Sequence, residues 1–221
     1  MMQGIRSVLV ATVLAIVAAP LAAQVRGIPV YNNGVPSGIG LYGDVGFPDD
    51  EAGGGKAFAL TGRVGFGTLG VTAMLSTYDP DGPPGSDLSV GATGNLRVFG
   101  GPLVPLLVTL QTGVGYAKPE SGVLPDESVD QWHFPVGLGF MLTIPNPALA
   151  IKPWLAPRLD IVTTTPDGEE STTDSEFGLS GGVELNLLSG LGFHAAYDAV
   201  FSDGTPGVFG VGAHYSFRTG L

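Results

Sequence analysis

The chain has 221 residues, of which 44% are hydrophobic and 13% are charged, and its formal net charge is −11. It contains no cysteine, which excludes disulfides, thiolate chemistry and cysteine zinc sites. Only 9 residues are Lys or Arg against 20 Asp or Glu, so a nucleic-acid partner is excluded as well. A composition this apolar predicts that much of the surface faces something other than water.

The N-terminus has the three parts of a secretory signal peptide. Arg6 supplies a positive charge, residues 7–19 form an apolar core, and residues 20–24 form a small-residue cleavage zone. We therefore predict a cleaved signal peptide over residues 1–23 and a periplasmic N-terminal segment over residues 24–37. The absence of cysteine excludes a lipoprotein anchor.

The mature chain offers no stretch suited to a membrane-spanning helix. Its longest uncharged run, residues 134–151, contains Pro135, Pro145 and Pro147, and prolines remove helix hydrogen bonds. A closed β-barrel is the other structure that satisfies all backbone polar groups in lipid.

Apolar and polar residues alternate with a period of two along most of the mature chain, which is typical of strands with two different faces. The segments with this pattern are residues 38–47, 57–66, 69–78, 88–98, 106–116, 131–144, 149–162, 177–187, 191–201 and 209–217. Pro153 and Pro157 predict a bulge or a late start in the seventh segment. We predict an all-β fold, an antiparallel up-and-down transmembrane β-barrel over residues 38–221 with ten strands. Eight strands is the alternative, and a secreted soluble β-sandwich is the rival fold.

The connections between these segments alternate in length, as in bacterial outer-membrane barrels. The long or polar ones, residues 48–56, 79–87, 118–130, 163–176 and 202–207, are expected outside. The short ones, near residue 67 and at 100–104, 145–148 and 188–190, are expected in the periplasm. Aromatic residues gather near both ends of the segments, which is typical of interfacial girdles.

The signal peptide, the ten alternating segments, the acidic loops and the last segment "GVFGVGAHYSF" together resemble the small outer-membrane barrels of Gram-negative bacteria, the OmpA-like and OmpW-like group. The resemblance covers the whole mature chain and rests on pattern rather than on a signature motif. It implies a porin-like fold in the cell outer membrane. Residues 218–221 follow the terminal aromatic Phe217, whereas chains of this group typically end at the aromatic.

The acidic residues are concentrated in the predicted outer loops. Those in the loops or at their margins are Asp49, Asp50, Glu51, Asp79, Asp81, Asp87, Glu120, Asp126, Glu127, Asp130, Asp167, Glu169, Glu170, Asp174, Glu176 and Asp203. We expect the exposed end to face lipopolysaccharide, with divalent cations as candidate bridging partners. No loop has the spacing of an EF-hand.

The charged residues within the segments all share the face opposite the apolar set. This phasing predicts a polar lumen, because a charge on the lipid side costs about 2–4 kcal/mol for Arg or Lys. The predicted lumen charge network is Asp44, Arg63, Arg97, Lys152, Arg158, Asp160, Glu184, His194, Asp198 and His214. The phasing suits salt-bridged plugs and an open channel equally.

Glu184 and His194 are equally spaced from the centre of the turn at 188–190, so a hairpin would place them opposite each other. His214 and Ser216 would lie close by on the last segment. A structural brace, a metal site, a proton-sensitive gate and a Ser/His/acid hydrolase all fit this set.

We predict a non-enzymatic monomer with a structural or surface-interaction role in the outer membrane, with no cofactor and no resident metal. The first alternative is a narrow channel for small or hydrophobic solutes. The second is a hydrolase in the lumen or at its rim that uses Ser216, His214 and Glu184.

Overall fold

A computed structural model describes residues 25–32, 34–36, 38–82, 85–101, 104–119, 129–168, 170–202 and 205–217. The predicted signal peptide, residues 1–23, lies outside the described residues. Among the described residues, no helix has the length and apolar character needed to cross a membrane.

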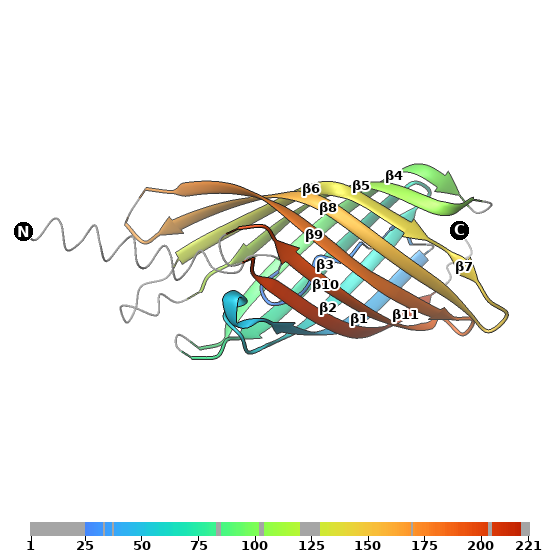
Figure 1. The fold of residues 1–221 in the computed structure, drawn as a ribbon, viewed down its shortest axis with the longest axis horizontal. Coiled ribbons are helices and arrows are strands. Elements are labelled where there is room, and N and C mark those ends of the chain that lie inside the picture. Colours follow the sequence, from blue (N-terminus) through green and yellow to red (C-terminus); the bar gives the residue numbers. More distant parts are fainter. Residues whose placement is uncertain are drawn as a thin grey trace, which may run out of the picture.

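Ten long antiparallel strands close into one barrel (Figure 1). They are β1 (Gly38–Pro48), β2 (Lys56–Phe66), β3 (Leu69–Asp79), β4 (Asp87–Gly101), β5 (Val104–Ala117), β6 (Val129–Leu142), β8 (Leu149–Pro166), β9 (Thr172–Leu187), β10 (Leu191–Val200) and β11 (Gly207–Phe217). A 3-10 turn, η1 (Asp50–Ala52), follows β1, and a two-residue strand, β7 (Ile144–Pro145), pairs with β8. Each long strand pairs with its neighbours, and β11 returns to β1. The ten-strand prediction is confirmed, and the eight-strand alternative and the β-sandwich are wrong.

Alternation along the strands places apolar side chains outside and polar ones inside. In β3 exposed and buried residues alternate from Leu69 to Asp79 without a break, because successive side chains of a strand point to opposite faces. The outer face carries a continuous set of exposed large apolar residues, among them Leu41, Phe58 and Leu60. Stacked or tilted aromatic pairs, such as Tyr116 with Trp132 and Phe177 with Phe201, lie near the long-loop end of this belt.

The strand with two prolines differs from the expectation. β8 begins at Leu149 and, with 18 residues, has neither a late start nor a register shift. Its pairing with β6 lapses opposite Pro157 and then resumes in the same register, because proline has no N–H to donate. The bulge falls instead on β4, between Arg97 and Gly101.

The connection predicted at residues 163–176 is largely strand. β8 continues to Pro166 and β9 starts at Thr172, with Thr163 paired to Thr173. Threonine is β-branched and favours extended backbone even where it is exposed. The result is a hairpin of the two longest strands, which reaches past the other strands at the long-loop end (Figure 1).

The N-terminal segment that we expected in the periplasm runs inside the barrel instead. We call residues 25–32 and 34–36 the inner segment. Arg26 lies near the long-loop end, where its backbone N–H donates to Ser89 Oγ at 3.1 Å, and the carbonyl oxygen of Pro36 lies against Gly65 near the β2–β3 turn. The segment therefore passes through the lumen from the long-loop end to the short-turn end before β1 begins (Figure 1).

Candidate functional site

The inner segment is held by both apolar and polar contacts with the wall. Val25 and Ile28 pack with Ala57, Met74 and Tyr78 in a buried cluster. Further along, Gln111 Nε2 donates to Asn32 Oδ1 at 2.9 Å, and Tyr31 meets Trp154 edge to face. Along much of the inner segment, the inward-facing side chains of the wall therefore contact this segment rather than water.

Two wall glycines make room for this segment. A Cβ on Gly46 would lie 1.8 Å from the carbonyl oxygen of Gly27, and one on Gly65 would lie 1.8 Å from that of Pro36. Any other residue at these positions would force the two backbones apart.

A first group of lumen charges, His133, Arg158, Asp160 and Asp198, is the loop-side cluster. Arg158 Nη1 donates to Asp198 Oδ1 at 2.6 Å, and Arg158 Nε lies 2.8 Å from Asp160 Oδ2. His133 Nε2 lies 2.8 Å from Asp160 Oδ1. All four residues are buried, and a buried charge is tolerated where it is paired and hydrogen-bonded.

The loop-side cluster also binds the inner segment. The backbone N–H of Val30 donates to Asp198 Oδ2 at 3.1 Å, and Arg158 Nη2 donates to the same oxygen at 3.1 Å. Asp198, fully shielded from solvent, therefore ties a wall arginine to the backbone of the inner segment.

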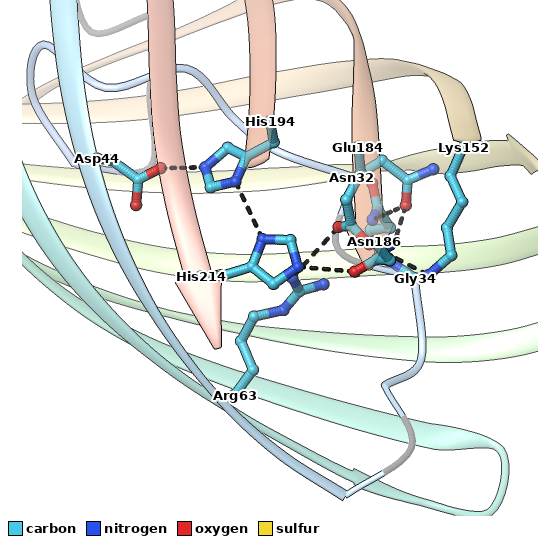
Figure 2. Close-up of polar contacts among 10 residues, drawn as sticks. Asn32, Gly34, Asp44, Arg63, Lys152, Glu184, Asn186, His194 and His214 are labelled. Atoms are coloured by element: carbon cyan, nitrogen blue, oxygen red, sulfur yellow. Dashed lines mark hydrogen bonds and ion pairs between the residues drawn. The ribbon is translucent and has the colours of Figure 1, made fainter. Parts of the chain in front are cut away.

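A second group, Asp44, Arg63, Lys152, Glu184, Asn186, His194 and His214, is the turn-side cluster (Figure 2). His194 Nε2 lies 2.5 Å from Asp44 Oδ1, and its Nδ1 lies 3.4 Å from Nδ1 of His214. His214 Nε2 in turn lies 2.7 Å from Asn186 Oδ1. These contacts form one chain of polar groups across β1, β10, β11 and β9.

Glu184 ends this chain between two cations (Figure 2). Its Oε1 accepts from Lys152 Nζ at 3.2 Å and from Asn186 Nδ2 at 2.5 Å, and its Oε2 lies 3.9 Å from Arg63 Nη1. The predicted hairpin register is confirmed, since His194 is the direct partner of Glu184 on β9.

Nine of the ten charged residues predicted for the lumen network thus fall into the two clusters. Arg97 does not join them; it lies near the short-turn end, where its Nη2 donates to the carbonyl oxygen of Gly67 at 2.9 Å. Arg97 follows Leu96, the last residue of β4 that pairs with β3, so it stands beside the β2–β3 turn and its side chain reaches that turn.

The hydrolase arrangement finds no support in these contacts. Both ring nitrogens of His214 are directed at other partners, His194 and Asn186, and Glu184 is directed at Lys152, Asn186 and Arg63. A nucleophilic serine needs a base within hydrogen-bond reach that is oriented by the acid.

The sequence reasoning missed the residues that the inner segment contributes, chiefly Arg26, Tyr31 and Asn32. Arg26 pairs with Asp87, a residue we had placed in an outer loop but which begins β4. Two signals could have found them: the segment is too rich in Val, Ile and Tyr for a periplasmic linker, and many inward positions are glycine.

Metal binding by the described residues is not indicated, because they contain no group of three or more His, Asp or Glu residues placed to hold an ion. The divalent cations considered for the outer loops stay a prediction.

A ring of ten antiparallel strands with an apolar outer belt and a polar interior faces lipid outside and a lumen inside. The fold is that of a bacterial outer-membrane barrel. No protein-family model matches the chain, and no curated protein matches it.

Several solved barrels are similar to this one at low sequence identity. The β domain of the Bordetella autotransporter BrkA has a TM-score of 0.49 and 17% identity, over 81% of this chain and 98% of that one. The translocator domain of the autotransporter NalP from Neisseria meningitidis has a TM-score of 0.46 and 14% identity, over 84% and 90% of the two chains. The attachment invasion locus protein Ail of Yersinia pestis has a TM-score of 0.39 and 13% identity, over 82% and 100%.

Proposed function

We propose that this barrel has a non-enzymatic structural or surface-interaction role in the outer membrane and that its lumen is closed to solutes by the inner segment. The supporting observation is the position of Val30, whose backbone N–H is bound by Asp198 in the middle of a paired and buried cluster. Opening a path for solutes would break this hydrogen bond and leave the buried charges of Asp198 and Arg158 with fewer hydrogen-bond partners.

The long-loop end supports the surface-interaction part of this proposal. The β8–β9 hairpin extends beyond the belt and exposes Thr172, Thr173 and Asp174. Hydroxyl pairs such as Thr163 with Thr173, at 3.0 Å, keep this hairpin ordered outside the belt. An ordered, protruding hairpin offers a fixed surface to partners outside the cell. We also propose that the protein acts as a monomer.

Conductance across a planar bilayer tests the closed lumen. We expect the wild-type protein to be silent and a variant that lacks residues 25–36 to show discrete openings. Gly65→Val, which forces the inner segment from the wall, should show intermittent openings, whereas Gly62→Val is the matched control because a Cβ there meets nothing within 4 Å. Steady conductance of the wild type would overturn the proposal.

The narrow channel is the second candidate, favoured by the charged lining of the lumen. It predicts a wild-type conductance that falls when Arg63, Asp44 or Asp198 is replaced. The hydrolase alternative predicts ester or lipid cleavage that Ser216→Ala abolishes. Fractionation and heat-modifiable migration in detergent test the location in the outer membrane, and N-terminal sequencing of the mature protein tests cleavage near residue 23.

A further inference from the structure

A cavity of about 310 Å³ lies between the end of the inner segment and the short-turn end of the barrel. Residues 34–36 bound it on one side, and Thr143 and Gly190, from the short connections, bound it on the other. Its volume is at the lower end of the range found for small-molecule sites, about 300–1,000 Å³. The barrel wall separates it from lipid, so ligands would reach it from the periplasmic side.

One wall of this cavity carries two cations and one carboxylate. Lys152 and Arg63 both lie beside Glu184, at 3.2 and 3.9 Å. The guanidinium of Arg63 also lies 4.3 Å from the ring centre of Tyr42, a cation–π contact that fixes its plane. Two positive charges and one negative charge leave this wall with one positive charge in excess.

Lys152 is the more accessible of the two cations. Its side chain keeps 28% of its exposure, whereas that of Arg63 keeps 3%. A lysine ammonium has three donors on a flexible stem. It can therefore turn toward a ligand in the cavity while Glu184 stays in place through Asn186.

Another part of the cavity lining is apolar. Val35 and Pro36 of the inner segment, with Leu107 of β5 and Met141 of β6, face the same space. Methionine is unbranched and adapts to ligands of irregular shape. A cavity that presents an apolar surface and a positive one together suits molecules with one charged end and one apolar part.

We propose that this cavity binds a small amphipathic monoanion, with its carboxylate at Lys152 and Arg63 and its hydrocarbon part against Leu107 and Met141. A single negative charge balances the excess charge of the wall. A dianion such as phosphate would carry more charge than the two cations can neutralise beside Glu184, and a cation would be repelled by both. This inference goes beyond the proposed role and does not depend on whether the lumen conducts.

Calorimetric titration of hexanoate into the protein in lipid nanodiscs tests the site, with empty nanodiscs to subtract partitioning into lipid. We expect saturable binding of hexanoate, weaker binding of hexanol and none of hexylammonium. Lys152→Met should weaken hexanoate binding by roughly tenfold, the loss of one ion pair. Lys118→Met is the matched control, because Lys118 lies outside the cavity beside Asp130, and should bind as the wild type does.

Leu107→Trp supplies a second, independent variant, because it fills the cavity and leaves its charges intact. It should abolish saturable binding, and heat-modifiable migration of each variant establishes that the barrel has folded. The proposal is overturned by an absence of saturable hexanoate binding, by equal binding of hexylammonium, or by full affinity in folded Lys152→Met or Leu107→Trp.

Discussion

The two polar clusters of the lumen use the same residue types in opposite ways. In the loop-side cluster, Arg158 lies between Asp160 and Asp198, all three are buried, and the inner segment donates to Asp198 through the backbone N–H of Val30. In the turn-side cluster, one carboxylate, Glu184, lies between two cations and borders a cavity. We infer that the fully covered charges brace the barrel, whereas Lys152, whose side chain keeps 28% exposure, remains available to a ligand.

The largest expected effect comes from Arg158→Met, which leaves two buried carboxylates without their common partner. We expect the free energy of unfolding to fall by about 3–5 kcal/mol, as for other broken buried ion pairs. Urea unfolding in lipid vesicles measures it. A loss below about 1 kcal/mol would show that the loop-side cluster does not brace the barrel.

Glu184→Gln should have a smaller effect, because its neighbours Lys152 and Asn186 can turn toward water in the cavity. We expect a loss of about 1.5–3 kcal/mol, the range for a hydrogen bond to a charged group. Asp174→Asn, on the exposed part of the same strand, should stay within about 0.5 kcal/mol. Equal losses for Glu184→Gln and Arg158→Met would remove the distinction between the clusters.

Salt should affect the clusters unequally. The Debye length falls from about 8 Å at 0.15 M salt to about 3 Å at 1 M. Salt therefore screens charges that water reaches, and it screens buried pairs much less. Lys152→Met should therefore cost up to about 1 kcal/mol at low salt and markedly less at 1 M. The stability lost in Arg158→Met should change little over the same salt range. If the losses of both variants declined in parallel, Arg158 would not be isolated from solvent.

Arg97→Met should have the smallest effect among the charges predicted for the lumen. The described contact of its side chain is the hydrogen bond to the Gly67 carbonyl at an exposed position, and we expect a loss of about 0.5 kcal/mol of unfolding free energy. The measurement is the same urea unfolding experiment. A loss as large as that of Arg158→Met would place Arg97 functionally with the lumen charges after all.

Sequence alone predicted the barrel well because its information is periodic and local. Strand phasing follows from alternation, and the pairing of Glu184 with His194 follows from a short turn whose centre fixes the register. Arg97 keeps the strand register, opposite the buried Thr109, but it stands beside the β2–β3 turn, so alternation predicts its face and not its separation from the two clusters.

The inner segment could not be predicted in the same way. It has no period, and its hydrogen bonds go to residues far along the chain, such as Val30 to Asp198. Glycine spacing in the wall signals that something approaches closely, but it does not say what. The burial of both clusters depends on this segment, so the difference between their environments could not be predicted from the sequence.

The closure between β1 and β11 also constrains the order of assembly. These are the first and last long strands, and they pair from Ile39 with Phe217 to Pro48 with Val208. The inner segment is continuous with β1 and already lies inside the ring that this pairing seals. We therefore expect the N-terminal residues to enter the nascent sheet before its final seam forms, so that the barrel is built around its own chain.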